Sequence, residues 1–304
     1  MQTFYMMVGI PGSGKSFFAE RVHNAVVHSS DAIRAEVLGD ENDQTKQELV
    51  FQTLHERVFR DLADGKNVVY DATNINYKRR MAFLQQINAM RIPSLWTVCV
   101  FMAVPYETCI ERNNNRERSV PEAVIHKMYK KFDIPMKAEG WDEILVVDSE
   151  DRFDRLNDLL TRLSKLDHDN PHHEYTVGLH CMATQQYLLT HYKDFDICLS
   201  RAALLHDIGK ERAKVFHDAK GNPTEIAHYY QHERMGAYES FGYTSDLSME
   251  QRLKVALLIR WHMWPYAVEK SDSPSKTANK IRRLLGEDIW KEVMVLNDCD
   301  RHAH

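Results

Sequence analysis

The feature that most constrains the fold is a glycine-rich turn near the start of the chain, GIPGSGKS at residues 9–16. The run TFYMMVGI leading into it is apolar and strand-like, and helical spacing resumes after it. Glycines let consecutive backbone N–H groups curl around phosphate oxygens, and the N-terminus of a helix adds a favourable dipole. Because such a turn joins a buried strand to a helix, the chain is expected to begin with a strand–turn–helix unit.

Valine-rich runs continue through the first half of the chain and read as buried strands, at residues 24–31, 66–73, 95–104 and 143–149. Helical patterns separate them, as at residues 45–65 and 76–90. Strands that alternate with helices pair in parallel through crossovers. The first half therefore predicts an α/β domain in which a parallel sheet carries helices on both faces.

The second half lacks strand signals, and all of its patterned segments read as helices. Residues 152–166 form an amphipathic pattern that we expect to close the first domain, and the polar stretch DHDNPHH follows. We therefore expect an α/β domain over residues 1–165 and an all-α domain over residues 166–304.

Composition narrows the functional classes. A net charge of −5 argues against a strongly basic nucleic-acid coat, although a local basic groove remains compatible with it. No apolar run approaches the roughly 20 residues of a membrane span, and no secretory signal opens the chain. The five cysteines form no CxxC pair and their number is odd, which favours reduced thiols and a cytoplasmic protein without a membrane partner.

The turn itself fits the phosphate-binding pattern G-x-x-x-x-G-K-[ST] between a strand and a helix. Lys15 would reach the β- and γ-phosphates of ATP or another nucleoside triphosphate, and the Ser16 hydroxyl would hold Mg²⁺. The remaining backbone of the turn would cradle the phosphates, so the predicted nucleotide-binding residues are Gly9, Gly12, Ser13, Gly14, Lys15 and Ser16.

Asp31 and Arg34 follow the second predicted strand, at the carboxyl end where open α/β sheets bind ligands. A carboxylate there can take the proton from an attacking hydroxyl, and an arginine can hold a substrate phosphate. Asp31 also suits a helix N-cap, a role compatible with catalysis.

The third predicted strand ends in Asp71, Thr73 and Asn74. Asp71 could orient a Mg²⁺-bound water, and Thr73 or Asn74 could touch the acceptor, although Asn74 equally suits a turn. Farther along, the polar stretch after residue 105 carries arginines at 112, 116 and 118. These could form a mobile lid over the γ-phosphate, or simply a solvated charged face.

Four segments in this order, GIPGSGKS, SSDAIR, YDATN and RNNNRERSVPEAVIHKMY, resemble the kinase domain of bacteriophage-type polynucleotide 5′-kinases over roughly residues 1–150. The resemblance implies that Asp31 is the general base for a 5′-hydroxyl and that Arg34 holds the acceptor phosphate. It also implies that Lys15, Arg116 and Arg118 act on the transferred phosphate, although the lid is one residue shorter than in the phage pattern. A small-molecule kinase shares much of this layout.

Twelve of the 16 histidines lie from His168 onward, and six His or Asp residues are spaced along the helical half: His180, His206, Asp207, His232, His262 and Asp300. Their order resembles the HD phosphohydrolase superfamily over roughly residues 170–304. The resemblance implies one or two divalent transition metals (Mn, Co, Ni, Fe or Zn). His180, His206, Asp207 and Asp300 would form the first site, and His232 and His262 would extend it to a second.

Several of these positions have rivals. His173 shares a helical face with His180, and Asp298 competes with Asp300. Lys210 could hold a substrate phosphate or cap a helix, and His228 could contact substrate or a metal ligand.

Cleavage of a nucleic-acid strand can leave a 5′-hydroxyl end and a 2′,3′-cyclic or 3′-phosphate end. Both ends must be repaired before a ligase can act, so a domain that adds phosphate and a domain that removes it share this substrate. The whole chain resembles bacterial end-healing proteins with the same two modules, which implies RNA or DNA ends as substrates and an RNA ligase as a partner. We therefore predict ATP- and Mg²⁺-dependent phosphorylation of 5′-hydroxyl ends combined with metal-dependent hydrolysis of 2′,3′-cyclic or 3′-phosphate ends, with RNA as the expected substrate. The alternatives are a nucleoside or sugar kinase fused to a nucleotide phosphohydrolase, and a nucleotide-gated sensor with a non-catalytic HD domain.

Overall fold

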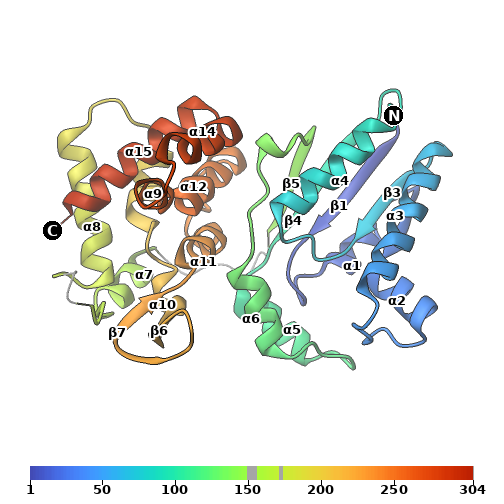
Figure 1. Cartoon of the computed structure of the whole chain (residues 1–304), viewed down its shortest axis with the longest axis horizontal. Helices are drawn as coiled ribbons and strands as arrows, with labels where there is room; N and C mark the ends of the chain where they lie inside the picture. Colours follow the sequence, from blue (N-terminus) through green and yellow to red (C-terminus); the bar gives the residue numbers. More distant parts are fainter. Residues whose placement is uncertain (149–155, 171–173, 304) are drawn as a thin grey trace. The chain divides into compact units, whose positions relative to one another are not determined.

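The chain divides into two compact units in a computed structural model that describes residues 1–148, 156–170 and 174–303 (Figure 1). The first unit comprises Met1–Met128 and Pro135–Glu150, and the second comprises Tyr129–Ile134 and Asp151–His304.

A five-stranded parallel sheet forms the centre of the first unit, in the order β2-β3-β1-β4-β5. All five strands fall within the valine-rich runs that predicted them, which confirms the α/β fold. Their bounds are β1 Thr3–Val8, β2 Ala25–Ser29, β3 Asn67–Asp71, β4 Trp96–Ala103 and β5 Glu143–Asp148.

Helices cover the sheet because its central strands are buried on both faces. Five of the six residues of β1 are buried and the sixth is partly buried, so neither face of this strand is open to solvent. Val98, Val100 and Met102 of β4 pack with Met7 of β1 in the core. The helical elements of this unit are α1 Lys15–Ala19, α2 Ser30–Leu38, α3 Gln47–Ala63, α4 Tyr77–Ala89, α5 Tyr106–Asn114, α6 Glu122–Lys130 and the 3₁₀ turn η1 Lys137–Glu139.

The strand order brings three predicted site segments to one edge of the sheet. β1 pairs with β3, and β3 pairs with β2, all in parallel, so their carboxyl ends share this edge. The amide of Gly9, just beyond β1, donates a hydrogen bond of 3.0 Å to the carbonyl oxygen of Thr73 beyond β3. The glycine-rich turn is thereby fixed beside the end of β3.

The second unit is built mainly from helices packed around a common core. α8 packs against α9 and α15, and α12 packs against α9 and α11. The helical elements are α7 Leu156–Leu163, α8 Val177–His191, α9 Ile197–Leu205, α10 Lys210–Ala213, α11 His232–Glu239, η2 Ser240–Tyr243, α12 Met249–Trp261, α13 Trp264–Glu269, α14 Pro274–Leu285 and α15 Glu287–His302.

The second unit is helical as expected, but it also contains an antiparallel hairpin that the sequence reading missed. Strands β6 Lys214–His217 and β7 Pro223–Tyr229 are joined by a turn in which Gly221 has a φ of +89°. The backbone amides of Lys220 and Asn222 both donate to Asp218 Oδ1 at 2.8 Å. This turn chemistry, followed by the β-favouring run TEIAHYY, is the signal that could have revealed the hairpin.

The helix expected to close the first domain belongs to the second unit. α7 packs against α8, where Gly178 lies so close to Ser164 that an added Cβ would be 2.5 Å from the Ser164 amide nitrogen. Arg162 also pairs with Glu211 of α10 at 2.7 Å. The apolar stripe of α7 was correctly expected to be buried, but periodicity does not specify which core buries it.

Within the described part of the chain, every helix is too short or too polar to cross a lipid bilayer.

Candidate active sites

The glycine-rich turn has a backbone that only glycine accommodates. Gly12 has a φ of +83°, and a Cβ atom there would lie 2.0 Å from the carbonyl oxygen of Cys109 on α5. Gly14 has a φ of +88° and precedes the first residue of α1. The buried hydroxyl oxygen of Ser13 has no hydrogen-bond partner among the residues that the structure describes. The turn thus keeps polar groups and a helix N-terminus free for an anion.

Lys15 and Ser16 extend from the start of α1 toward the end of β3. Burial lowers the pKa of Lys15, whose Nζ donates to the carbonyl oxygen of Ile10 at 3.0 Å. The Ser16 hydroxyl donates to Asp71 Oδ2 at 2.8 Å, and burial raises the pKa of Asp71. A hydroxyl and a carboxylate oxygen beside a phosphate-binding turn are the hard ligands that Mg²⁺ takes.

Asp31 lies in the first turn of α2, between two arginines. Ser29 caps the helix through its hydroxyl oxygen, so the cap role considered for Asp31 falls to Ser29. Arg34, whose side chain is almost fully buried, holds Asp31 Oδ1 at 2.6 Å, while 54% of the Asp31 side chain remains exposed. The Nε of Arg34 has no hydrogen-bond partner among the described residues. An exposed carboxylate with a fixed orientation can receive a proton from an incoming hydroxyl.

Arg118 also reaches Asp31, with its Nη1 at 3.4 Å from Asp31 Oδ2. Its guanidinium donates to the side chain of Asn42 and the backbone carbonyl of Glu41, each at 2.9 Å. Arg116 lies close enough to Lys15 to add to the lowering of its pKa by burial. Of the two predicted lid arginines, Arg118 therefore lies at the Asp31 carboxylate, and the charge of Arg116 acts on Lys15.

The residues after β3 hold the loop in place. Asn74 has a φ of +46°, and its side-chain amide donates to the carbonyl oxygen of Met7 at 2.8 Å. Thr73 offers its backbone carbonyl to Gly9. The observed contacts of both residues tie β3 to β1, and neither contact shows a side chain directed at an acceptor.

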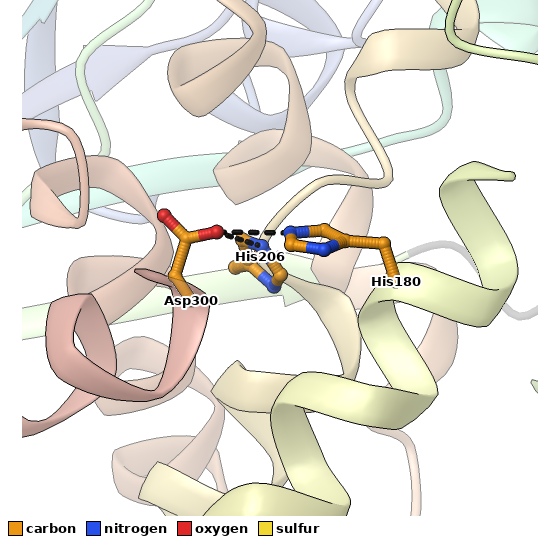
Figure 2. Close-up of side chains that lie close together, drawn as sticks. All are labelled: His180, His206 and Asp300. Carbon is orange, nitrogen blue, oxygen red and sulfur yellow. Dashed lines mark hydrogen bonds and ion pairs between the residues drawn. The ribbon is translucent and has the colours of Figure 1, made fainter. Parts of the chain in front are cut away.

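In the second unit, six predicted metal ligands converge from five segments. His180 lies on α8, His206 and Asp207 follow α9, His232 begins α11, His262 follows α12 and Asp300 lies on α15. They form two groups in which all ligand atoms lie within 4.8 Å of one another, His180 with His206 and Asp300, and Asp207 with His232 and His262. Figure 2 shows the first group, with both imidazoles turned toward the Asp300 carboxylate.

Asp207 connects the two groups. Its Oδ2 lies 3.4 Å from His206 Nε2 and 3.7 Å from His180 Nε2, while its Oδ1 lies 3.2 Å from His232 Nε2 and 3.9 Å from His262 Nε2. Asp300 Oδ1 lies 2.9 Å from His180 Nε2 and 3.4 Å from His206 Nε2. A carboxylate with one oxygen on each group is placed to bridge two cations.

The backbone fixes the tautomer of all four histidines. Each Nδ1–H donates to a carbonyl oxygen, at 3.1 Å from His180 to Ala303, 2.9 Å from His206 to Ala203, 2.8 Å from His232 to Tyr229 and 2.7 Å from His262 to Ile259. A neutral imidazole held in this way presents the lone pair of Nε2. The four Nε2 atoms all face Asp207, so the donor set fits transition-metal ions.

Burial acts to lower the pKa of His206, but Asp207 outweighs it and raises this pKa well above its usual range, so this ring gains a proton when no metal competes for it. Two other pKa shifts agree with a metal site. Burial lowers the pKa of His262 to about 3, and the neighbouring His232 lowers it further, so this ring is neutral and able to ligate at neutral pH. Burial acts to raise the pKa of Asp207, but Lys210 and His206 outweigh it and hold this pKa well below its usual range. The Lys210 ammonium lies 2.7 Å from Asp207 Oδ2.

The structure also places the rivals of these ligands. Asp298 accepts a hydrogen bond of 2.6 Å from the Tyr192 hydroxyl and lies outside both groups. His228 lies on β7, where its ring stacks on Tyr230 at a centroid distance of 5.5 Å. His173 falls outside the described residues.

Two neighbours of the metal groups were missed by sequence reasoning. The Tyr266 hydroxyl donates to Asp300 Oδ2 at 3.0 Å, and the fully buried ring of His168 packs edge-on against His180 at 5.9 Å. Tyr266 lies one helical turn beyond His262, which is the one sequence signal that could have indicated it.

Comparison with known families gives two separate matches along the chain. The family model of an AAA domain matches residues 4–135, and that of an HD domain matches residues 177–303. A P-loop kinase-like domain is joined here to an HD domain. Kinase and HD hydrolase families both support enzymatic activity for this P-loop–HD chain.

Similar proteins resemble only part of the P-loop–HD chain. The L-seryl-tRNA(Sec) kinase of Methanococcus maripaludis is 25% identical over 171 residues, which cover 53% of this chain and 64% of that protein. The putative bifunctional polynucleotide kinase/RNA ligase of Autographa californica nuclear polyhedrosis virus is 29% identical over 143 residues, 42% of this chain and 20% of that protein. The chain spans 18% to 64% of the curated relatives it matches.

Among solved structures, a chain of the Pnkp1/Rnl/Hen1 RNA repair complex is 21% identical with a TM-score of 0.36, and the match covers 43% of each chain.

Proposed function

We propose that the P-loop–HD chain heals nucleic-acid ends, with RNA as the preferred substrate. The P-loop domain would transfer the γ-phosphate of ATP to a 5′-hydroxyl, and the HD domain would hydrolyse 2′,3′-cyclic or 3′-phosphate ends. The observation that carries this proposal is that one chain contains both a site suited to phosphate transfer and a cluster of metal-ligand residues suited to phosphate hydrolysis. Asp31 is held by Arg34 beside a phosphate-binding turn, and Asp207 lies between two ligand groups.

In the kinase step, each residue acts through the contacts described above. The backbone of residues 9–16 and Lys15 would bind the triphosphate, and Ser16 with Asp71 would hold its Mg²⁺. Asp31 would accept the proton of the attacking hydroxyl, in an orientation fixed by Arg34. The partnerless Nε of the buried Arg34 is available to an acceptor phosphate. Arg116 and Arg118 would stabilise the charge on the transferred group.

In the hydrolytic step, His180, His206, Asp207 and Asp300 would hold one divalent metal, and His232 and His262 with Asp207 would hold a second. Such ions, when bound, supply Lewis-acid polarisation of the phosphate ester and activate water. The Nδ1–H contacts would keep the ligands oriented, and Lys210 would hold a phosphate oxygen of the substrate beside Asp207.

The nature of the acceptor rests on the relatives. The viral relative is named as a putative bifunctional polynucleotide kinase/RNA ligase, which supports a nucleic-acid end as the acceptor and a ligase as the next enzyme. The archaeal relative is named as an L-seryl-tRNA(Sec) kinase, which favours a second candidate, a hydroxyl attached to an RNA molecule. Both candidates require phosphorylation of a hydroxyl, but they differ in which hydroxyl receives the phosphate.

The deciding experiment offers the protein labelled ATP with three acceptors: a 5′-hydroxyl oligoribonucleotide carrying a 2′,3′-cyclic end, a mononucleoside, and seryl-tRNA. We expect label on the oligonucleotide 5′ end and loss of the cyclic end when Mn²⁺, Co²⁺ or Ni²⁺ is added. Label on the nucleoside or the seryl group alone would disprove end healing by the kinase. Persistence of the cyclic end with every metal would support the nucleotide-gated sensor.

A further inference from the structure

Helix α14 carries a stripe of exposed basic side chains on a protein whose net charge is −5. Residues 270–283 contain five basic side chains and one acidic side chain. Lys276, Lys280 and Arg283 are all exposed, and their spacing of four and three residues places them on one face of the helix. We call these three residues the α14 basic stripe.

The stripe lies on the side of α14 away from the core. Ile281 and Leu285 are the buried residues of this helix, and they are rotated by roughly half a turn from the stripe at 100° per residue. Arg282, between these faces, is paired with Glu287 at 2.7 Å. No acidic partner accompanies Lys276, Lys280 or Arg283 within the described part of the chain. The stripe therefore presents three uncompensated positive charges to solvent.

Both helices that support α14 contribute to the HD site. α14 packs against α13 and α15, and Figure 1 shows α14 beside α15. α13 carries Tyr266 and α15 carries Asp300, whose side chains are hydrogen-bonded to each other at 3.0 Å. The helix that carries the stripe thus packs directly against the two helices that carry Tyr266 and Asp300.

We propose that the α14 basic stripe binds the sugar–phosphate backbone of the strand whose 3′ end enters the HD site. This inference rests on the proposed function, because it assigns the path of the nucleic-acid substrate. The stripe is about 10 Å long at 1.5 Å per residue, and its three cationic side chains are long and flexible. Each of them can therefore reach a phosphate of a single strand that runs along this face of α14. Contacts of this kind position a strand without reading its sequence.

The test measures binding rather than turnover. A fluorescent 12-nucleotide RNA with a 3′-hydroxyl end, which the HD domain cannot hydrolyse, is titrated by anisotropy with the full chain and with the triple variant Lys276→Gln, Lys280→Gln, Arg283→Gln. We expect about tenfold weaker binding at low salt and a salt slope shallower by about two, since each single-strand phosphate contact contributes roughly 0.7. Equal binding by the triple variant would overturn the proposal.

A matched control removes the same charge elsewhere. Lys165, Lys193 and Lys220 are also exposed, and the triple variant Lys165→Gln, Lys193→Gln, Lys220→Gln changes the net charge equally. We expect it to bind RNA as the wild type does, and an equal loss would show a general charge effect and reject the stripe. Poly-glutamate that displaces the RNA at equal charge concentration would instead indicate an acidic protein partner and reject a nucleic-acid path. Retained metal content of the HD domain verifies that the variants fold.

RNA binding by the stripe variant and end hydrolysis by the wild type test the inference and the proposed function independently. If the wild type hydrolyses cyclic ends and the stripe variant binds RNA normally, end healing stands and the stripe fails. If the stripe variant alone loses binding and the wild type hydrolyses no end, the stripe stands and end healing fails.

Discussion

The Nε2 atoms of His232 and His262 lie 3.3 Å apart, although each ring already donates its Nδ1–H to a backbone carbonyl oxygen. Two neutral imidazoles in this arrangement turn lone pairs toward each other. A cation between them removes this repulsion and uses both lone pairs as ligands. The contact therefore supports the proposed cation site at His232 and His262.

Removing one of these two rings should remove a metal. We expect His262→Gln to reduce the metal bound per chain after loading with Mn²⁺. Cyclic-end hydrolysis should fall by at least about 10- to 100-fold, the loss that follows even when only a hydrogen-bond partner of a metal ligand is replaced. Metal content measured by mass spectrometry gives the first readout. The exposed His191 at the end of α8 provides the control His191→Gln, and equal metal loss there would contradict the assignment.

Two substitutions on α2 distinguish a catalytic base at Asp31 from a residue that only forms a surface ion pair. We expect Asp31→Ala to lower 5′-kinase activity by about 10²- to 10⁴-fold, as general-base loss does, while hydrolysis by the HD domain persists. Glu36 on the same helix also pairs with an arginine, Arg57, at 2.6 Å. The variant Glu36→Ala should keep full kinase activity, and an equal loss would point to damage of α2 instead.

Gly12 should be intolerant of any side chain. Gly12→Ala would place a Cβ 2.0 Å from the Cys109 carbonyl oxygen in addition to straining a φ of +83°. Gly39 has a similar φ of +78° but nothing within 4 Å of its Cβ position. Gly39→Ala should therefore lower the free energy of unfolding by only about 1–2 kcal/mol, and Gly12→Ala by more, with loss of ATP binding. Urea denaturation and calorimetric titration with MgATP compare the two, and equal costs would argue against the predicted contact with α5.

His55 should make the stability of the first unit depend on pH. Burial lowers the pKa of its ring, which packs against Phe83 at 4.6 Å and lies 3.2 Å from the Tyr70 hydroxyl. Between the folded pKa and the ordinary histidine pKa of 6.5, the unfolded chain binds more protons than the folded chain. The contribution of His55 is thus complete above pH 6.5 and is lost as the pH falls through the folded pKa.

We therefore expect His55→Gln to flatten the decline in the free energy of unfolding of this unit below pH 6.5, measured by urea denaturation at several pH values. His23→Gln, at an exposed position of the same unit, is the control and should follow the wild-type curve. Parallel curves for His55→Gln and the wild type would show that burial of this ring has no effect on stability.

The sequence by itself determined the sheet and the chemistry of the phosphate-binding turn. Valine-rich runs specify buried strands locally, and the glycines and Lys15 act through backbone and side-chain groups within eight consecutive positions. Sequence also supplied the six possible metal ligands, because few other roles require so many ordered His and Asp residues. It missed the β6–β7 hairpin, because most of β6 was read as the end of a helical pattern and no strand was recognised in residues 217–230.

Tertiary structure alone decided which of these groups meet. His180 and Asp300 are 120 positions apart yet form a 2.9 Å contact, and Asp298 and Asp300 differ only in the face of α15 that they occupy. The same holds for α7, whose apolar stripe gave no indication of the core that buries it. The physical reason is that periodicity shows which residues are buried, whereas long-range packing between helices selects their partners.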